Sequence, residues 1–321
     1  MKLIFTLVAV FVTTGPFSGF AQSTYPDRPI HLIYGFPAGN DIVPRIFAGK
    51  LAEVLRQPVI FDNVTGAAGN IAADHIAKAP PDGYTIGILT GANITINPTL
   101  YKKLPYDPAR DLKPVTLIFG YPNLLVVHND VPARSVGELV DLARRQPNIL
   151  TYGHQGPGTT VHLSAEILKS MAHIDVQGVP YRGPSAVLTD LMSERITMAF
   201  VSPAPTIPLI QEGKLRALAV TSRSRASFAP DIPTMEEAGF PGFEVTVWFG
   251  LFVPAGTPAV IVERLNQEAV KIMTSPDVQK KAMDIGQVAL SDTSAEFAEL
   301  IKNETLYWAR VIKNAGIEQI E

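Results

Sequence analysis

The sequence has no cysteine among its 321 residues. This absence excludes disulfide bonds, thiolate ligands for zinc or iron–sulfur clusters, a cysteine nucleophile and a lipid-modified N-terminal cysteine. An excess of positive charge is also missing, because 27 Lys and Arg residues stand against 30 Asp and Glu residues and the formal net charge is -3. Binding to a phosphate backbone usually needs a cationic excess, so nucleic acid is not an expected partner.

The motifs of common enzymes are absent as well. There is no Gly-x-Ser-x-Gly, no His-Glu-x-x-His and no phosphate-loop Gly-Lys-Ser/Thr, and the six histidines show no metal-ligand spacing. We therefore expect a protein that is not an enzyme and that uses neither a metal nor a cofactor. The competing hypothesis is an exported hydrolase that uses Ser164 or Ser185 with His162, although no nucleophile-elbow pattern is present.

Long hydrophobic runs are scarce, and the N-terminal one is short. Lys2 precedes the apolar stretch 3–12, and the small residues Gly19 and Ala21 stand at the -3 and -1 positions of a signal-peptidase site. Residues 1–21 are therefore predicted to be a signal peptide that is cleaved after Ala21, which places the mature protein in the periplasm. A membrane anchor is the alternative, but threonines and Pro16 interrupt the run before it reaches the roughly 20 residues that a span needs.

Length and periodicity predict an α/β protein with two domains. The chain is longer than one typical globular unit, and apolar β-prone runs alternate with amphipathic helical stretches, as in parallel βαβ units. The first unit is predicted to have strands 30–34, 59–63 and 85–90 and helices 42–56 and 68–79. The second is predicted to have strands 124–127, 150–153, 176–180, 196–201 and 215–220 and helices 136–145, 159–172 and 185–194. Three further helices are predicted to begin near Ala259, Pro276 and Ala295.

Two apolar runs lie where one α/β unit gives way to the other, namely 115–119 with 124–127, and 245–253. They indicate that the chain crosses twice between the domains. The prediction is a discontinuous first domain, residues 26–123 plus 249–321, and an inserted second domain, residues 124–248, with a ligand cleft between them. The alternative is two sequential domains that share no sheet.

Ligands of open parallel sheets collect at the carboxyl ends of strands, so the strand-to-helix loops are the candidate site. The first such loop offers Ala38, Gly39, Asn40 and Asp41, where Asp41 is either a ligand contact or a helix N-cap. The second loop is rich in glycine, and its amides and hydroxyls could receive an anion. Its candidate ligand-binding residues are His154, Gly156, Gly158, Thr159 and Thr160.

Two shorter loops complete the candidate site. Thr90, Gly91 and Ala92 follow the third predicted strand. Arg182 precedes the helix that begins near Ser185, and its guanidinium could pair bidentately with a carboxylate or form an ordinary surface salt bridge.

Ordered motifs along the whole mature chain resemble those of a known family. The sequence is similar to the Bug (TctC-like) family of tripartite tricarboxylate transporter substrate-binding proteins. The motifs that carry the resemblance are Phe36-Pro37-Ala38-Gly39, Gly66-Ala67-Ala68-Gly69-Asn70, Pro81-Asp82-Gly83-Tyr84, Leu104-Pro105-Tyr106-Asp107, the glycine loop from Tyr152 to Leu163, Val179-Pro180-Tyr181, Gly213-Lys214-Leu215-Arg216-Ala217-Leu218 and Trp248-Phe249-Gly250.

The resemblance implies a two-domain periplasmic binding protein fold of the type II kind, which closes on a small organic carboxylate. It implies a monomer whose partner is the membrane permease of a tripartite transporter or, alternatively, a membrane sensor kinase. It also implies anion contacts at residues 38–41 and at Gly156, Gly158, Thr159 and Thr160. Two departures from the family pattern, a shorter first loop and Val201-Ser202 in place of a polar pair, imply a ligand that differs from the commoner ones.

Overall fold

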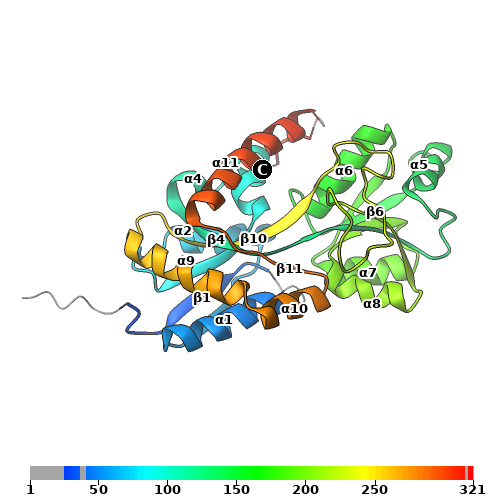
Figure 1. Cartoon of the computed structure of the whole chain (residues 1–321). Coiled ribbons are helices and arrows are strands. Elements are labelled where there is room, and N and C mark those ends of the chain that lie inside the picture. The colour runs from blue at the N-terminus through cyan, green and yellow to red at the C-terminus, as the bar shows by residue number, and fades with distance from the viewer. Residues whose placement is uncertain (1–24, 37–40, 315–316, 321) are drawn as a thin grey trace, which may run out of the picture.

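The computed structural model describes residues 25–36, 41–314 and 317–320. It is a mixed α/β protein of two domains, each built on its own sheet, and Figure 1 shows the two sheets side by side with the long strands β4 and β10 reaching from one toward the other. None of the helices in the described part of the chain combines the length and the apolar character that a bilayer span requires.

The first sheet has the strand order β11-β4-β10-β3-β1-β2. Strand β1 pairs in parallel with β2 and β3, whereas β10 runs antiparallel between β3 and β4. The strands are β1 (Ile30–Tyr34), β2 (Val59–Asn63), β3 (Thr85–Thr90), β4 (Leu112–Pro122), β10 (Thr246–Pro254) and β11 (Val288–Ala289). The parallel βαβ pattern thus holds for the first three strands. Strand β4 runs in the same direction as these three, whereas β10 and β11 run in the opposite direction.

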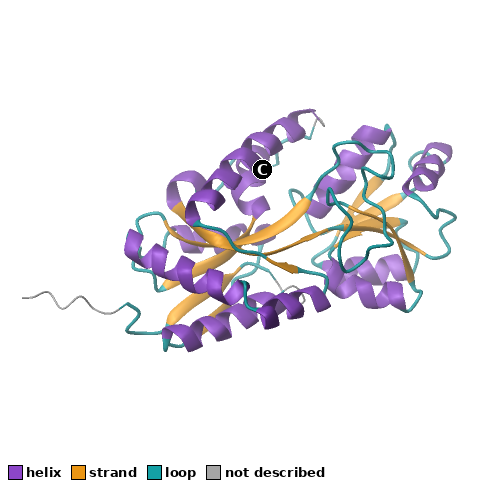
Figure 2. Cartoon of the chain, viewed as in Figure 1, coloured by secondary structure: helices purple, strands orange, loops and turns teal. Residues whose placement is uncertain are grey.

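Helices cover both faces of this sheet (Figure 2). Strand β1 shows why, because Leu32 and Tyr34 pack with α1 and α9 while Ile33 packs with α2 and α11 on the opposite face. The elements are α1 (Ile42–Leu55), η1 (Ala67–Gly69), α2 (Asn70–Ala77), η2 (Ala92–Ile96), α3 (Asn97–Leu100), α4 (Pro108–Asp111), α9 (Ala259–Met273), α10 (Pro276–Asp284) and α11 (Ser294–Asn314).

The second sheet has the strand order β7-β6-β8-β5-β9. Strand β6 is parallel to β7 and β8, and β5 is antiparallel to β8 and β9. The strands are β5 (Leu124–His128), β6 (Thr151–His154), β7 (Gln177–Pro180), β8 (Met198–Val201) and β9 (Leu215–Val220). The helices are α5 (Val136–Arg145), α6 (Thr160–Ala172), α7 (Pro184–Met192) and α8 (Pro203–Gln211).

The chain crosses between the sheets twice, and the two crossings touch. Strand β4 ends at Pro122 and β5 begins at Leu124, so Asn123 alone separates the two sheets on the first passage. On the return, the Thr221 hydroxyl accepts from the Asn123 N–H at 2.8 Å and donates to the Val245 carbonyl at 2.5 Å. One threonine therefore ties both crossings together at the floor of the space between the domains.

Apolar packing also joins the domains. Trp308 and Ile312 of α11 and Leu100 of α3 belong to the same buried cluster as Tyr152 and Leu168 of the second domain. This packing places α11 in contact with both domains.

Candidate functional site

Two adjoining cavities lie between the domains. The smaller one, here called the inner cavity, has a volume of about 60 Å³ and takes side chains from both sheets. Its lining consists of Phe36, Ala68, Thr90, Ala92, Tyr121, Asn123, Gln155, Thr159, Thr160, Val161, Ser202, Val247 and Phe249.

The larger one, here called the outer cavity, has a volume of about 300 Å³. Its lining consists of Gly35, Phe36, Thr65, Gly66, Ala67, Ala68, Gly69, Gln155, Thr159, Tyr181, Arg182, Gly183 and Pro184. Because Phe36, Ala68, Gln155 and Thr159 line both cavities, the two are neighbouring parts of one cleft.

The outer cavity is built to receive an anion. Three helices begin at its wall, since Gly69, Thr159 and Gly183 are the N-caps of α2, α6 and α7. Helix N-termini present unpaired N–H groups and a partial positive charge, and the two glycine caps have no side chain that could satisfy those groups. Arg182 adds a full positive charge, and among the described residues no carboxylate forms an ion pair with this exposed side chain.

The wall of the outer cavity at the start of α2 requires a glycine at position 69. Its φ is +92°, and a Cβ there would lie 2.9 Å from the Phe36 ring and 3.0 Å from Asn93 Oδ1. Asn93 holds the turn from behind, because its Nδ2 donates to the Ala68 carbonyl at 3.0 Å and its Oδ1 accepts from the Thr90 hydroxyl at 2.8 Å. The loop before α2 is thus fixed in place by buried hydrogen bonds before any ligand arrives.

The inner cavity differs in chemistry from the outer one. None of its described lining residues is charged. One wall is aromatic, with Phe36 and Phe249 in edge-to-face contact at 5.8 Å and Tyr121 at 6.0 Å from Phe249. Burial raises the pKa of the Tyr121 hydroxyl, so that group is neutral at ordinary pH. The cleft therefore joins a cationic compartment to an uncharged one.

Two buried polar side chains of the inner cavity have no hydrogen-bond partner in the part of the chain that the structure describes. Both amide atoms of Asn123 and the hydroxyl of Ser202 are unpaired among the described residues, and these side chains are 0% and 3% exposed. Asn123 did not stand out in the sequence, because a single residue between two strands is a common feature, and Ser202 stood out only through the departure of Val201-Ser202 from the family pattern. The two residues come together only because β5 pairs with β8, and this long-range pairing cannot be read from the local sequence.

The structure brings several of the expected site residues to the cleft. Thr90, Ala92, Thr159 and Thr160 line the inner cavity, and Arg182 lines the outer one. Gly91 stands beside this wall, where a Cβ would lie 2.7 Å from the indole of Trp248.

Other expected residues lie elsewhere. His154 is 7% exposed and packs between the rings of Tyr152 and His162, and its Nδ1 accepts from the Gly156 N–H at 3.2 Å. Burial lowers the pKa of His154, so the protonated imidazole that a carboxylate contact would need is disfavoured. Gly158 faces the other domain, and a Cβ there would lie 2.7 Å from Leu100 Cδ2.

The first predicted loop is described only at its ends. Ala38, Gly39 and Asn40 lie outside the described residues. Asp41 occupies the N-cap position of α1 but makes no side-chain cap bond; its carboxylate accepts from Arg45 Nε at 2.7 Å. The ion pair with Arg45 therefore replaces the simple capping role considered for Asp41.

The serines of the hydrolase hypothesis are not arranged for catalysis. Ser164 is fully buried and its hydroxyl donates to the Thr160 carbonyl at 2.8 Å, while burial lowers the pKa of His162 to about 4. Ser185 is exposed at the start of α7.

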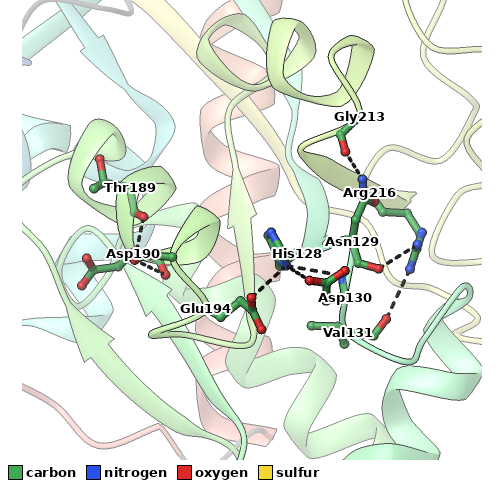
Figure 3. Close-up of polar contacts among 10 residues, drawn as sticks. His128, Asn129, Asp130, Val131, Thr189, Asp190, Glu194, Gly213 and Arg216 are labelled. Atoms are coloured by element: carbon green, nitrogen blue, oxygen red, sulfur yellow. Dashed lines mark hydrogen bonds and ion pairs between the residues drawn. The ribbon is translucent and has the colours of Figure 1, made fainter.

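A separate polar cluster lies at the far end of β5 from Asn123 (Figure 3). His128 Nδ1 lies 3.9 Å from Asp130 Oδ2 and 3.7 Å from Glu194 Oε1. The same nitrogen accepts from the Asp130 N–H at 3.3 Å, and Arg216 donates to the carbonyls of Asn129, Val131 and Ala133. Both carboxylates are exposed. The arrangement is that of a hydrogen-bonded turn, and we assign no ligand to it.

Comparisons with known proteins agree with this two-domain fold. The family model described as the tripartite tricarboxylate transporter family receptor, TctC, matches residues 43–317. The UPF0065 protein in the tcbD-tcbE intergenic region of Pseudomonas sp. (strain P51) is 36% identical over 308 residues, which are 95% of this chain and 91% of that protein. The solved structure of R. palustris Rpa4515 with adipate has a TM-score of 0.87 at 36% identity and covers 92% of this chain and 100% of its own. That of the periplasmic binding protein BugD has a TM-score of 0.85 at 29% identity, with the same coverage.

Proposed function

The chain belongs to the TctC family of tripartite tricarboxylate transporter receptors, and on that premise we propose that it is a periplasmic solute-binding protein for a small organic carboxylate. In this role it is not an enzyme: it captures its ligand between the two domains and presents the closed form to a membrane partner. The adipate bound to Rpa4515 supports the ligand class, because that protein is 36% identical to this chain.

One observation carries the proposal. The starts of α2, α6 and α7 and the side chain of Arg182 surround a single cavity, and together they supply positive potential without a metal ion. Such a site stabilises a carboxylate through backbone N–H groups and one guanidinium. The helices come from both domains, so a bound anion holds the domains together.

Closure follows from the chain path. We propose that residues 26–123 plus 249–321 and residues 124–248 move as two bodies about the two crossings, one at Asn123 and one at the start of β10. The hydrogen bonds of Thr221 support a hinge there, because they join the two crossings to each other.

We further propose that the protein is a monomer and that its partner is the permease of a tripartite transporter, as the name of the family implies. Co-purification of the ligand-saturated protein with candidate membrane subunits tests the partner. Capture of a sensor kinase in place of the permease would assign a signalling role to the same closed form. The predicted signal peptide, residues 1–21, lies outside the described residues and is tested by N-terminal sequencing of the mature protein.

The direct test is calorimetric titration with a panel of small carboxylates, preceded by mass spectrometry of any acid carried through purification. Arg182→Gln is expected to weaken binding of the best acid about tenfold, because one charge-assisted hydrogen bond is lost. Arg134→Gln, a substitution of an exposed arginine at the start of α5, is the matched control and should bind as the wild type does. The proposal fails if no carboxylate in the panel binds.

A further inference from the structure

We propose that the end of the ligand opposite its carboxylate carries an uncharged group that both donates and accepts hydrogen bonds, such as a hydroxyl or a carboxamide. This inference rests on the proposed function, because it concerns the far end of the same bound acid. The two side chains that carry it are Asn123 and Ser202 in the inner cavity.

These two residues stand opposite each other. Strands β5 and β8 are antiparallel with Leu124 paired to Val201, so the next residues outward, Asn123 and Ser202, continue the same register. Side chains in facing positions of an antiparallel pair lie about 5 Å apart on one face of the sheet. The pair therefore forms one polar spot at the edge of the second sheet, where both residues line the cavity.

The backbone N–H and carbonyl of Asn123 are both hydrogen-bonded, whereas its side chain is not hydrogen-bonded to any described residue. Its N–H donates to the Thr221 hydroxyl at 2.8 Å and its carbonyl accepts from the Thr221 N–H at 3.0 Å. The amide side chain is 0% exposed, and neither its Oδ1 nor its Nδ2 has a partner among the described residues. The Ser202 hydroxyl is in the same condition. Because buried polar groups are nearly always hydrogen-bonded, the bound molecule is the expected partner.

The three unpaired atoms select the chemistry of that partner. Asn123 offers one acceptor, Oδ1, and one donor group, Nδ2, while a serine hydroxyl can act as either. An ionised carboxylate can only accept hydrogen bonds, so it would leave the acceptor Oδ1 of Asn123 without a donor and next to a negatively charged oxygen. No described residue that lines this cavity is charged, and the start of α6, which lines the same cavity, would offset a buried anion with a partial positive charge only. A hydroxyl or a carboxamide can pair with both side chains.

Size and orientation agree with this assignment. The inner cavity, at about 60 Å³, has room for only a few non-hydrogen atoms, whereas the outer cavity of about 300 Å³ contains Arg182 and the starts of α2 and α7. The ligand therefore directs its carboxylate toward Arg182, lays its hydrocarbon part against the Phe36 and Phe249 rings, and ends between Asn123 and Ser202.

The experiment compares acids that differ only at the far end. Calorimetry is performed with butanoate, pentanoate and hexanoate, with their ω-hydroxy counterparts, and with the dicarboxylates of the same lengths, all at pH 8, where both carboxyl groups are ionised. The best ω-hydroxy acid is expected to bind at least about fivefold more tightly than the unsubstituted acid of its length, and more tightly than the dicarboxylate.

Variants separate a ligand contact from a structural role. Asn123→Leu and Ser202→Ala should abolish the preference for the hydroxy acid, and without ligand they should melt at the wild-type temperature or above it, because no hydrogen bond of the free protein is lost. Ser170→Ala, at an exposed serine of α6, should keep the preference.

Three outcomes are decisive. Equal binding of hydroxy and unsubstituted acids overturns the inference and means that water satisfies the two side chains, while the proposed function stands. Tighter binding of a dicarboxylate also overturns the inference and leaves the proposed function standing. Absence of binding by every acid overturns the proposed function itself.

Discussion

Acid should destabilise this protein through a half-buried histidine, His162. His162 lies in the first turn of α6 with its Nδ1 buried and unpaired among the described residues, and its ring is 4.8 Å from that of His154. Burial, together with the neighbouring His154 and Lys169, lowers the pKa of His162 from 6.5 to about 4, and Glu166 acts in the opposite direction. The native state therefore resists a proton that the unfolded chain accepts.

The sign and size of the effect follow from linkage. Between pH 6.5 and about pH 4 the unfolded state binds more protons than the native state, so the free energy of unfolding falls as the pH falls through this window. With these two pKa values, the loss between pH 7 and pH 5 is about 2 kcal/mol. Above the unfolded pKa, both states carry a neutral imidazole and the effect disappears.

Urea denaturation followed by circular dichroism at pH 7, 6 and 5 measures this loss. His162→Gln removes the titrating group and should reduce the acid-induced loss by about 2 kcal/mol relative to the wild type. His75→Gln is the matched control, since His75 is exposed in the last turn of α2, and it should keep the wild-type pH dependence. Identical pH dependence in His162→Gln and the wild type would refute the reasoning.

Three further substitutions test the packing and the caps. Gly158→Val should cost more unfolding free energy than Gly156→Val, because both glycines have positive φ but only the Cβ at 158 would contact Leu100 of the other domain, at 2.7 Å; urea denaturation compares the two, and equal losses would contradict the contact. Glu304→Gln should remove a decline in melting temperature as the pH rises above 4.5, since burial raises the pKa of Glu304 above that value and the native state resists its ionisation; an unchanged decline would exclude this cause. Ser135→Ala should lower the free energy of unfolding by about 1 kcal/mol, because its hydroxyl caps α5, and a change near zero would mean that water replaces the cap.

Local periodicity was enough to predict many elements. Strands β1, β3 and β9 and helix α5 have the residue bounds that their apolar patterns predicted, because each is a short uninterrupted run with a clear period. Helix α8 was not predicted, since Pro203, Pro205 and Pro208 suggest a loop; Pro203 begins the helix, where its missing N–H costs nothing, and Pro208 lies inside it.

The candidate site was only partly predictable. Thr159 and Arg182 lie in loops that connect a strand to a helix, and such loops can be recognised from a single sequence. Both residues line the cleft. Asn123 and Ser202 require knowledge of which strands pair and in what register, and that information is spread over about 80 residues of sequence. His154 has the sequence context of an exposed loop residue, but packing with two aromatic rings buries it.

The position of β10 has a consequence for how the chain acquires its structure. This strand joins β3 to β4 within the first sheet, yet it follows the whole second domain in the sequence. As the chain emerges from its N-terminus onward, the second domain is complete while β3 and β4 still present open edges, one on each side of the missing strand. The first sheet therefore cannot be completed until β10 has been synthesised. During this interval the open edges of β3 and β4 are most exposed to non-native strand pairing.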